Sequence, residues 1–368
     1  MSLKLNRRGF LATSGAAAGA LTFLGTKGAF AQNGGTLRFG LSAYPPSLDV
    51  WASNGTAAGT IKLLCHRGLL SYDKDGVMQG ELAESWDVAD DGTWTFKLRD
   101  AMWHDGTPVT AEDVAWTVTE AQKPDSAAYL QGQLSTITSV ETPDEKTVVM
   151  KTDEPQAVLP GWFAHYNMSI MKTGSERDSL MGAGPFKLVS MDRGVSISVE
   201  ANPDYYKEGL PKVAGIDAIV YADENLRVAA LEAGDVDIVE YVPWQAMAQV
   251  GENDDLQLDT TFGPFMYLTF NATKPPFDNP LVRRAIGHAI KREDIAAAAF
   301  YERGAPLEHL PIADASAFYN ADLANSWNYD PEKAQSLLAE AGYPDGFDCT
   351  MLSTAQYGMH QSTAEVCQ

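Results

Sequence analysis

Cysteine and histidine are scarce in this chain. Its 368 residues include three cysteines and six histidines. No C-x-x-C or H-E-x-x-H spacing occurs, so the sequence predicts neither a thiol redox centre nor a metal site. The cysteines leave two possibilities open, a Cys349–Cys367 disulfide or free thiols. The histidines are scattered, which argues against a dedicated metal cage; they are His66, His104, His165, His288, His309 and His360.

Positive charge is also in short supply. Lysine and arginine number 27 against 49 aspartates and glutamates, for a formal net charge of -22. Such a field repels phosphate backbones and anionic lipid, so nucleic acid and membrane surfaces are not expected partners. The G-x-S-x-G motif, the phosphate-binding loop and the c-type haem motif are missing too. We therefore expect no catalytic residues and no cofactor.

No apolar run is long enough for a comfortable membrane span. The run Phe10–Leu24 follows Arg7 and Arg8, and Ala29-Phe30-Ala31 supplies the small-x-small pattern of a signal-peptidase site. Paired arginines before Gly-Phe-Leu resemble a twin-arginine export signal, and a Sec signal is the alternative. Residues 1–31 are therefore predicted to be a signal peptide that is cleaved after Ala31, leaving the mature protein in the periplasm.

Hairpins and helices alternate along the mature chain. Three stretches carry alternating apolar residues on both sides of a turn, at 84–100, 138–152 and 186–202. Helix starts are marked by Thr110 with Asp113, by Asn279-Pro280 and by Asp330-Pro331. Because strands and helices interleave without a strict βαβ rhythm, the expected fold is mixed α/β.

The stretch "MWHDGTPVTAEDVAWT" places His104 beside Asp105 in front of one of these helices. Asp105-Gly106 makes a turn, Pro108 stiffens the approach and Thr110 caps the helix. No second histidine lies within helical or hairpin reach of His104, so a metal site is not supported. We expect His104 to be structural.

A resemblance to a known family rests on this region. Residues 81–117, "ELAESWDVADDGTWTFKLRDAMWHDGTPVTAEDVAWT", resemble the signature of the extracellular solute-binding proteins of family 5, the peptide- and nickel-binding components of ABC importers. In that family the signature is scaffolding. Further similar blocks lie at 44–50, 68–76, 182–189, 202–217, 231–239, 267–295 and 329–343.

The resemblance implies a periplasmic binding protein of two lobes, with an extra domain inserted in the first. On this chain the first lobe would comprise 32–72 and 179–264, and the insertion 73–178. The last lobe would begin near 265 and be incomplete, because the sequence stops at Gln368. Such lobes close on a ligand by hinge motion.

Candidate ligand contacts follow from the same resemblance. They lie in the loop after the first strand, in "YVPWQ" at the expected edge of the cleft, and on the segment entering the last lobe. Aromatic side chains with a polar tip suit a site that buries and orients a solute, although each of them could instead pack in the core. The residues are Tyr44, Trp51, Asn54, Gly55, Thr56, Trp244, Phe265 and Tyr267.

The implied function is capture of a peptide-like or other small polar solute for delivery to the permease subunits of an ABC importer. The resemblance suggests a monomer. The alternatives are a carrier of nickel or a metal complex, an exported hydrolase, and a ligand sensor that serves a receptor.

The export assignment predicts the behaviour of one double substitution. Replacing Arg7 and Arg8 together with lysine keeps the charge but removes the arginine pair, so the precursor should remain in the cytoplasm. Cell fractionation with an immunoblot measures this. Unchanged export of the double variant would contradict a twin-arginine signal.

Overall fold

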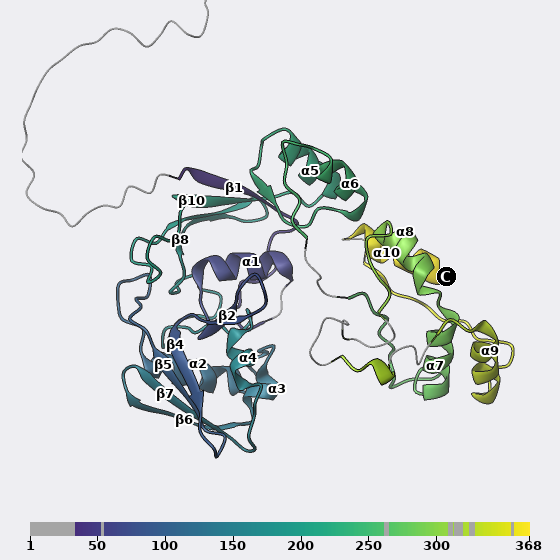
Figure 1. The fold of residues 1–368 in the computed structure, drawn as a ribbon, viewed down its shortest axis with the longest axis horizontal. Coiled ribbons are helices and arrows are strands. Elements are labelled where there is room, and N and C mark those ends of the chain that lie inside the picture. Colours follow the sequence, from purple (N-terminus) through teal and green to yellow (C-terminus); the bar gives the residue numbers. More distant parts are fainter. Residues whose placement is uncertain are drawn as a thin grey trace, which may run out of the picture.

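The computed structural model describes residues 34–52, 55–260, 265–307, 312, 319–323, 328–354 and 357–368. The predicted signal peptide, with Arg7, Arg8 and the cleavage position after Ala31, lies outside the described residues, as does Asn54. The fold is mixed α/β, as predicted, with two main sheets followed by a group of helices (Figure 1).

A five-stranded sheet, called the large sheet below, combines the start of the chain with its middle. Its order is β11-β1-β10-β9-β8. Strand β1 pairs in parallel with β10 and β11, whereas β10, β9 and β8 pair antiparallel. Helix α1 packs on it with Ile61 and Cys65 in the shared core, and α5 and α6 lie at one end of the sheet (Figure 1). The bounds are β1 Thr36–Leu41, α1 Thr56–Cys65, β8 Phe186–Asp192, β9 Ser196–Ala201, β10 Gly215–Val220, α5 Glu224–Glu232, β11 Ile238–Val239, η1 Trp244–Ala246 and α6 Met247–Gly251.

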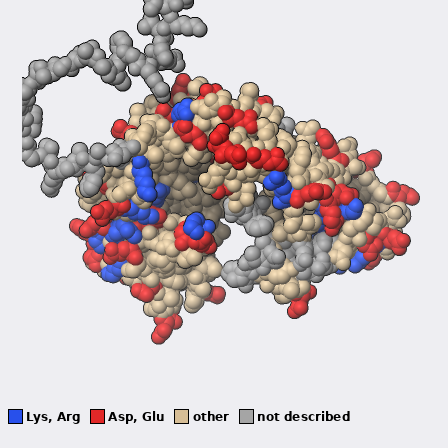
Figure 2. Space-filling model, turned by 45° about the horizontal axis from the view of Figure 1, so that its top comes forward, with Lys and Arg blue, Asp and Glu red and all other residues tan. Residues whose placement is uncertain are grey.

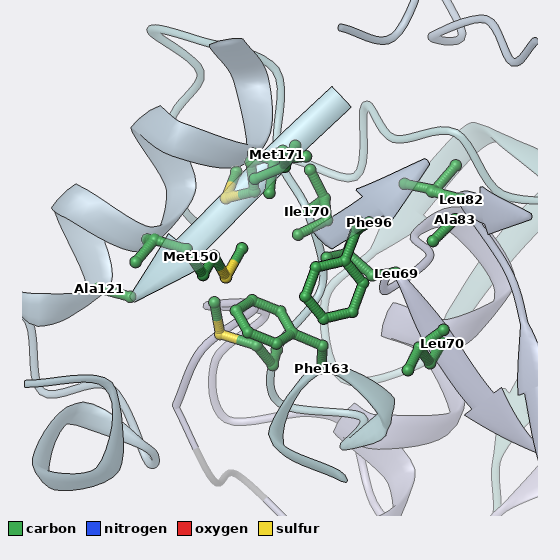
Figure 3. Close-up of a cluster of buried hydrophobic side chains, with 14 of the residues drawn as sticks. Leu69, Leu70, Leu82, Ala83, Phe96, Ala121, Met150, Phe163, Ile170 and Met171 are labelled. Atoms are coloured by element: carbon green, nitrogen blue, oxygen red, sulfur yellow. The ribbon is translucent and has the colours of Figure 1, made fainter. Parts of the chain in front are cut away.

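A four-stranded antiparallel sheet, called the small sheet, is inserted between β1 and β8 in sequence. Its order is β4-β5-β7-β6, and helix α2 packs against it. The ring of Phe96 on β5 lies 5.7 Å from that of Phe163 on α4, within a core that also takes in Met150 (Figure 3). Strands β2 and β3 form a separate two-stranded sheet. The bounds are β2 Leu70–Tyr72, β3 Met78–Gly80, β4 Ala83–Val88, β5 Trp94–Leu98, α2 Ala111–Gln122, α3 Gln131–Leu134, β6 Ile137–Asp144, β7 Thr147–Thr152 and α4 Leu159–Ala164.

Helices dominate the described part of the chain after residue 265. Helix α7 packs on α9, and α8 packs on α10. Figure 1 shows this group, which we call the C-terminal helices, set to one side of the two sheets. The bounds are α7 Pro280–Ala289, α8 Arg292–Phe300, η2 Ala321–Leu323, α9 Pro331–Glu340 and α10 Gly358–Cys367.

The predicted hairpins and helix starts are confirmed. The hairpins are β4–β5, β6–β7 and β8–β9. Thr110 and Asp113 form the capping box of α2, because each accepts a hydrogen bond from the backbone of the other. Asn279 accepts from the backbone N–H of Leu281 at 2.9 Å, and Asp330 caps α9 in a similar way. Local sequence therefore determines where these elements begin.

All three cysteines are free thiols in this structure: Cys65 is buried and Cys349 is exposed. The Cys349–Cys367 disulfide is thus not formed here. Within the described ranges, no helix combines the length and apolar character needed to cross a membrane.

The end of α1 and the segment entering β8 approach each other more closely than side chains would permit. A Cβ atom on Gly182 would lie 2.1 Å from the carbonyl oxygen of Cys65, and one on Gly184 would lie 2.5 Å from the Cys65 carbonyl carbon. The Gly184 N–H donates to that same Cys65 oxygen at 2.8 Å. Only glycine allows the backbones to meet in this way.

The imidazole of His104 bonds to the same contact between the end of α1 and residues 182–184, which we call the junction. Its Nε2 lies 3.1 Å from the carbonyl oxygen of Gly184, and its Nδ1 accepts a hydrogen bond from the N–H of Gly182 at 3.2 Å. Burial lowers the pKa of His104 and favours the neutral ring that this pairing requires. The expected structural role of His104 agrees with this geometry, because both ring nitrogens are occupied by backbone groups.

The close approach of these backbones predicts how a single methyl group added at Gly182 changes the stability of the protein. Gly182→Ala should lower the free energy of unfolding by about 1–3 kcal/mol or more, because the new Cβ meets backbone rather than a movable side chain. Thermal or urea unfolding measures the change. Gly132→Ala is the matched control, since a Cβ there meets nothing within 4 Å and stability should stay level or rise slightly. Equal stabilities of Gly182→Ala and the parent protein would contradict the account of the junction.

Candidate solute-binding site

The loop from β1 to α1 holds most of the predicted ligand contacts, and the structure divides them. Trp51 is 0% exposed, with its indole N–H donating to the carbonyl oxygen of Ser169 at 3.1 Å. The guanidinium of Arg177 lies 5.1 Å from the indole ring centre. Trp51 therefore packs in the core in this structure and exposes no surface, which agrees with the core-packing alternative.

The other described members of that loop differ in exposure. Tyr44 is half-buried against the core of the large sheet. Gly55 and Thr56 are exposed at the start of α1. Gly55 has a φ of 87° and lies at the N-cap, so no side chain caps the first N–H groups of the helix. The first N–H groups form the positive end of the helix dipole, where a carboxylate is favoured.

A row of three stacked aromatic rings lies beside this loop and was not predicted. Tyr129 and His165 stack with centres 5.0 Å apart, and His165 and Tyr166 with centres 4.8 Å apart. The backbone N–H of Tyr129 donates to the Trp51 carbonyl at 2.8 Å, and the Tyr166 ring covers Gly59 of α1. Tyr129 is 55% exposed, so the row begins at the surface and ends against α1. The adjacent aromatic pair in "AHYNM" was the only local signal.

Trp244 lies where the large sheet's end meets the C-terminal helices. Its indole N–H donates to the sulfur of Met359 at 3.1 Å, and its ring meets Phe300 edge-on at 5.0 Å. The hydroxyl of Tyr241 donates to the same sulfur at 3.3 Å, and its ring lies 4.8 Å from Tyr357. Partial burial raises the pKa of Tyr241 to about 12, which keeps this donor protonated.

Phe265 and Tyr267 lie on the segment that leads to the C-terminal helices. Their rings are 5.7 Å apart, and the side chains are 42% and 69% exposed. They pack on each other at the surface. Exposure on this scale leaves both rings available to a ligand, and core packing was the weighed alternative.

Figure 2 shows a hollow between the part of the molecule that holds the two sheets and the part that holds the C-terminal helices. Acidic side chains are spread over both parts, as expected from the net charge. Tyr241 and Trp244 reach the C-terminal helices from the first part. The predicted residues are thus divided between separate groups. Glu240, four residues before Trp244, connects the two, because its carboxylate accepts hydrogen bonds from Ser42 in the loop and from Thr60 on α1.

The chemistry of these groups suits binding rather than catalysis. Burial raises the pKa of the Cys65 thiol to about 12 and lowers the pKa of His66 to about 4, so neither is poised as nucleophile or base near neutral pH. Among the described residues, no cluster of three or more histidine, cysteine, aspartate or glutamate side chains is arranged to hold a metal ion. What the site offers is aromatic surface and backbone donors.

Comparison with known proteins defines the class of protein. Residues 77–368 match the bacterial extracellular solute-binding proteins, family 5, and the chain belongs to that family. The fold is that of the two-lobed periplasmic binding proteins. The predicted family and fold are therefore confirmed.

The relatives carry more particular names. The glutathione-binding protein GsiB of Pectobacterium atrosepticum is 31% identical over 334 residues, covering 88% of this chain and 64% of the relative. The structure of AgaA from A. tumefaciens R10, solved with agropinic acid, is 40% identical with a TM-score of 0.87, covering 91% of this chain and 70% of AgaA. MoaA, solved with mannopinic acid, is 27% identical with a TM-score of 0.78. This chain thus spans about two thirds of the length of these proteins.

Proposed function

We propose that this protein is the solute-binding component of an ABC importer, and that its solute is a small polar compound built on an amino acid. The observation that carries the proposal is the similarity to AgaA, at 40% identity and a TM-score of 0.87. AgaA was solved with agropinic acid, and the GsiB relatives are named for the peptide glutathione. We propose two candidate classes for this solute, an amino-acid conjugate of the opine type or a short peptide.

The proposed lobes follow the two sheets. The first lobe is 32–72 with 179–264, the insertion is 73–178 and the last lobe begins near 265. Support comes from the chain path, because the strands of the large sheet flank those of the small sheet in sequence. A solute bound between the first and last lobes favours their closed arrangement.

The proposed contacts are those that the structure leaves accessible. Gly55 and Thr56 supply backbone donors for a carboxylate at the start of α1. Tyr129 supplies a ring face from the neighbouring aromatic row, and Trp244 another at the C-terminal helices. Asn54, Phe265 and Tyr267 remain proposed contacts on the ground of the family resemblance.

Export, location and partners belong to the same proposal. The protein acts in the periplasm as a monomer after cleavage behind Ala31 and delivers its solute to the permease subunits. It is not an enzyme and uses no cofactor. The nickel-carrier alternative loses support from the scattered histidines, and the hydrolase alternative from the absence of its motifs.

Isothermal calorimetry on the complete gene product tests the proposal. The panel contains agropinic acid, mannopinic acid, glutathione, dipeptides and a nickel–histidine complex. We expect one amino-acid conjugate or peptide to bind, and a hundredfold excess over its Kd to stabilise the protein by about 2.7 kcal/mol. Binding of the nickel complex alone, or turnover of a panel compound, would contradict the proposal.

A substitution in the aromatic row tests where the solute binds. Tyr129→Ala should weaken binding of the solute about tenfold, because an aromatic contact contributes about 0.5–1.5 kcal/mol beyond the area it buries. Tyr72→Ala is the matched control, since Tyr72 is 51% exposed and lies on β2, outside the row. If Tyr129→Ala and Tyr72→Ala bind the solute with equal affinity, Tyr129 is not part of the site, and the proposed function itself still stands.

A further inference from the structure

A lysine ammonium is fully buried beneath the loop that joins β1 to α1. Lys62 lies on α1 and is 0% exposed. Its Nζ donates to the carbonyl oxygens of Asp49 at 3.2 Å and Ala52 at 2.8 Å, and to Oδ1 of Asn167 at 2.9 Å. All three N–H groups of the ammonium are therefore used.

These three bonds join three separate segments of the chain. The donor is on α1, two acceptors are backbone groups of the loop, and Asn167 lies beyond the small sheet in the sequence. Burial of a cation is costly, and an apolar side chain would fill the same space without that cost. The three hydrogen bonds offset the cost of burying the ammonium and connect segments that an apolar side chain would leave unconnected.

The same loop is held from the other side by Arg177. The guanidinium pairs with the carboxylate of Asp49 at 2.5 Å, and the carbonyl oxygen of Arg177 accepts from the N–H of Val50 at 3.0 Å. These contacts hold the loop against one segment only. Lys62 is the group that also ties it to α1.

We propose that Lys62 is a positioning residue for solute binding: its ammonium fixes the loop 49–52, and through it the exposed start of α1 and the ring of Tyr129. The link to Tyr129 is direct, because its backbone N–H donates to the Trp51 carbonyl. The link to Gly55 and Thr56 runs through α1, because the helix that they begin also carries Lys62. The effect on affinity rests on the proposed function.

The protonation state of Lys62 makes this role dependent on pH. Burial lowers its pKa to about 8, while Asp49 acts to raise it. The other charged or titratable groups around the ammonium are Arg177, His66, His165 and Tyr166; burial lowers the pKa of both histidines, which stay neutral in mildly alkaline solution. A neutral amine has two N–H donors, so deprotonation leaves one of the three acceptors without a partner.

The signs of the two pH effects differ. The folded-state pKa of Lys62 lies below the ordinary lysine pKa of 10.5, so the folded protein binds fewer protons than the unfolded chain between the two values. The contribution of Lys62 to stability therefore rises with pH between about 8 and 10.5. In the folded protein, deprotonation removes one of the three hydrogen bonds to these acceptors as the pH rises through about 8. If Lys62 had only a structural role, the affinity for the solute would not fall with pH while the contribution of Lys62 to stability rises.

Lys62→Met tests the proposal, with Lys74→Met as the matched control because Lys74 is exposed and pairs only with its neighbour Asp75 among its described ion pairs. Hydrogen exchange reports on the loop without any ligand. We expect the amides of Val50, Trp51 and the first turn of α1 to exchange about tenfold faster in Lys62→Met, and those of the small sheet to be unchanged. Loop exchange equal to that of the parent would overturn the proposal.

Binding is measured with agropinic acid, or with whichever panel solute binds the parent protein. Lys62→Met should raise the Kd about tenfold, and the Kd of the parent should rise between about pH 7 and 9 whereas that of the variant stays flat. Faster loop exchange with unchanged affinity would overturn the positioning role. If no solute binds the parent, the proposed function fails, while exchange still decides whether Lys62 holds the loop.

The parent protein alone supplies a second measurement if Lys62→Met does not fold. Its loop amides should lose protection relative to those of the small sheet as the pH rises through about 8, after correction for intrinsic exchange. A constant ratio between the two regions would overturn the proposal.

Discussion

The contact between the end of α1 and residues 182–184 sets the geometry on which the rest of the structure depends. Two glycines allow the backbones to touch at Cys65, and His104 bonds both of them from the small sheet. Helix α1 of the large sheet and the loop of the small sheet are thereby fixed at one point. Because interiors are close-packed, a junction without spare volume transmits position from one sheet to the other.

The candidate site is built on this junction rather than beside it. The ammonium of Lys62 lies one turn before Cys65 on α1. The C-terminal end of the helix is thus anchored at Cys65, and through Lys62 the same helix holds the loop that precedes its N-terminal end. The aromatic row reaches the same helix through Tyr166. A solute that contacts the start of α1 therefore meets a preorganised surface, which lowers the entropic cost of binding.

Sequence reasoning predicted what depends on near neighbours. The hairpins and the caps at Thr110, Asn279 and Asp330 rest on interactions within a few residues, and all are present. The sequence left open whether Trp51 is buried, because its indole bonds Ser169, 118 residues away in the sequence. The stacking of Tyr129 on His165 was missed for the same physical reason, since tertiary packing brings the two rings together.

The central claim is that a solute binds between the first and last lobes and favours their closure. The direct test is a distance measurement by electron spin resonance on the complete gene product. One label is placed on exposed Cys349 and the other on Lys212→Cys, at an exposed position of the first lobe, with Cys367→Ser to avoid a third site. Addition of the solute identified by calorimetry should shorten the distance between the labels. An unchanged distance with solute bound would contradict the claim.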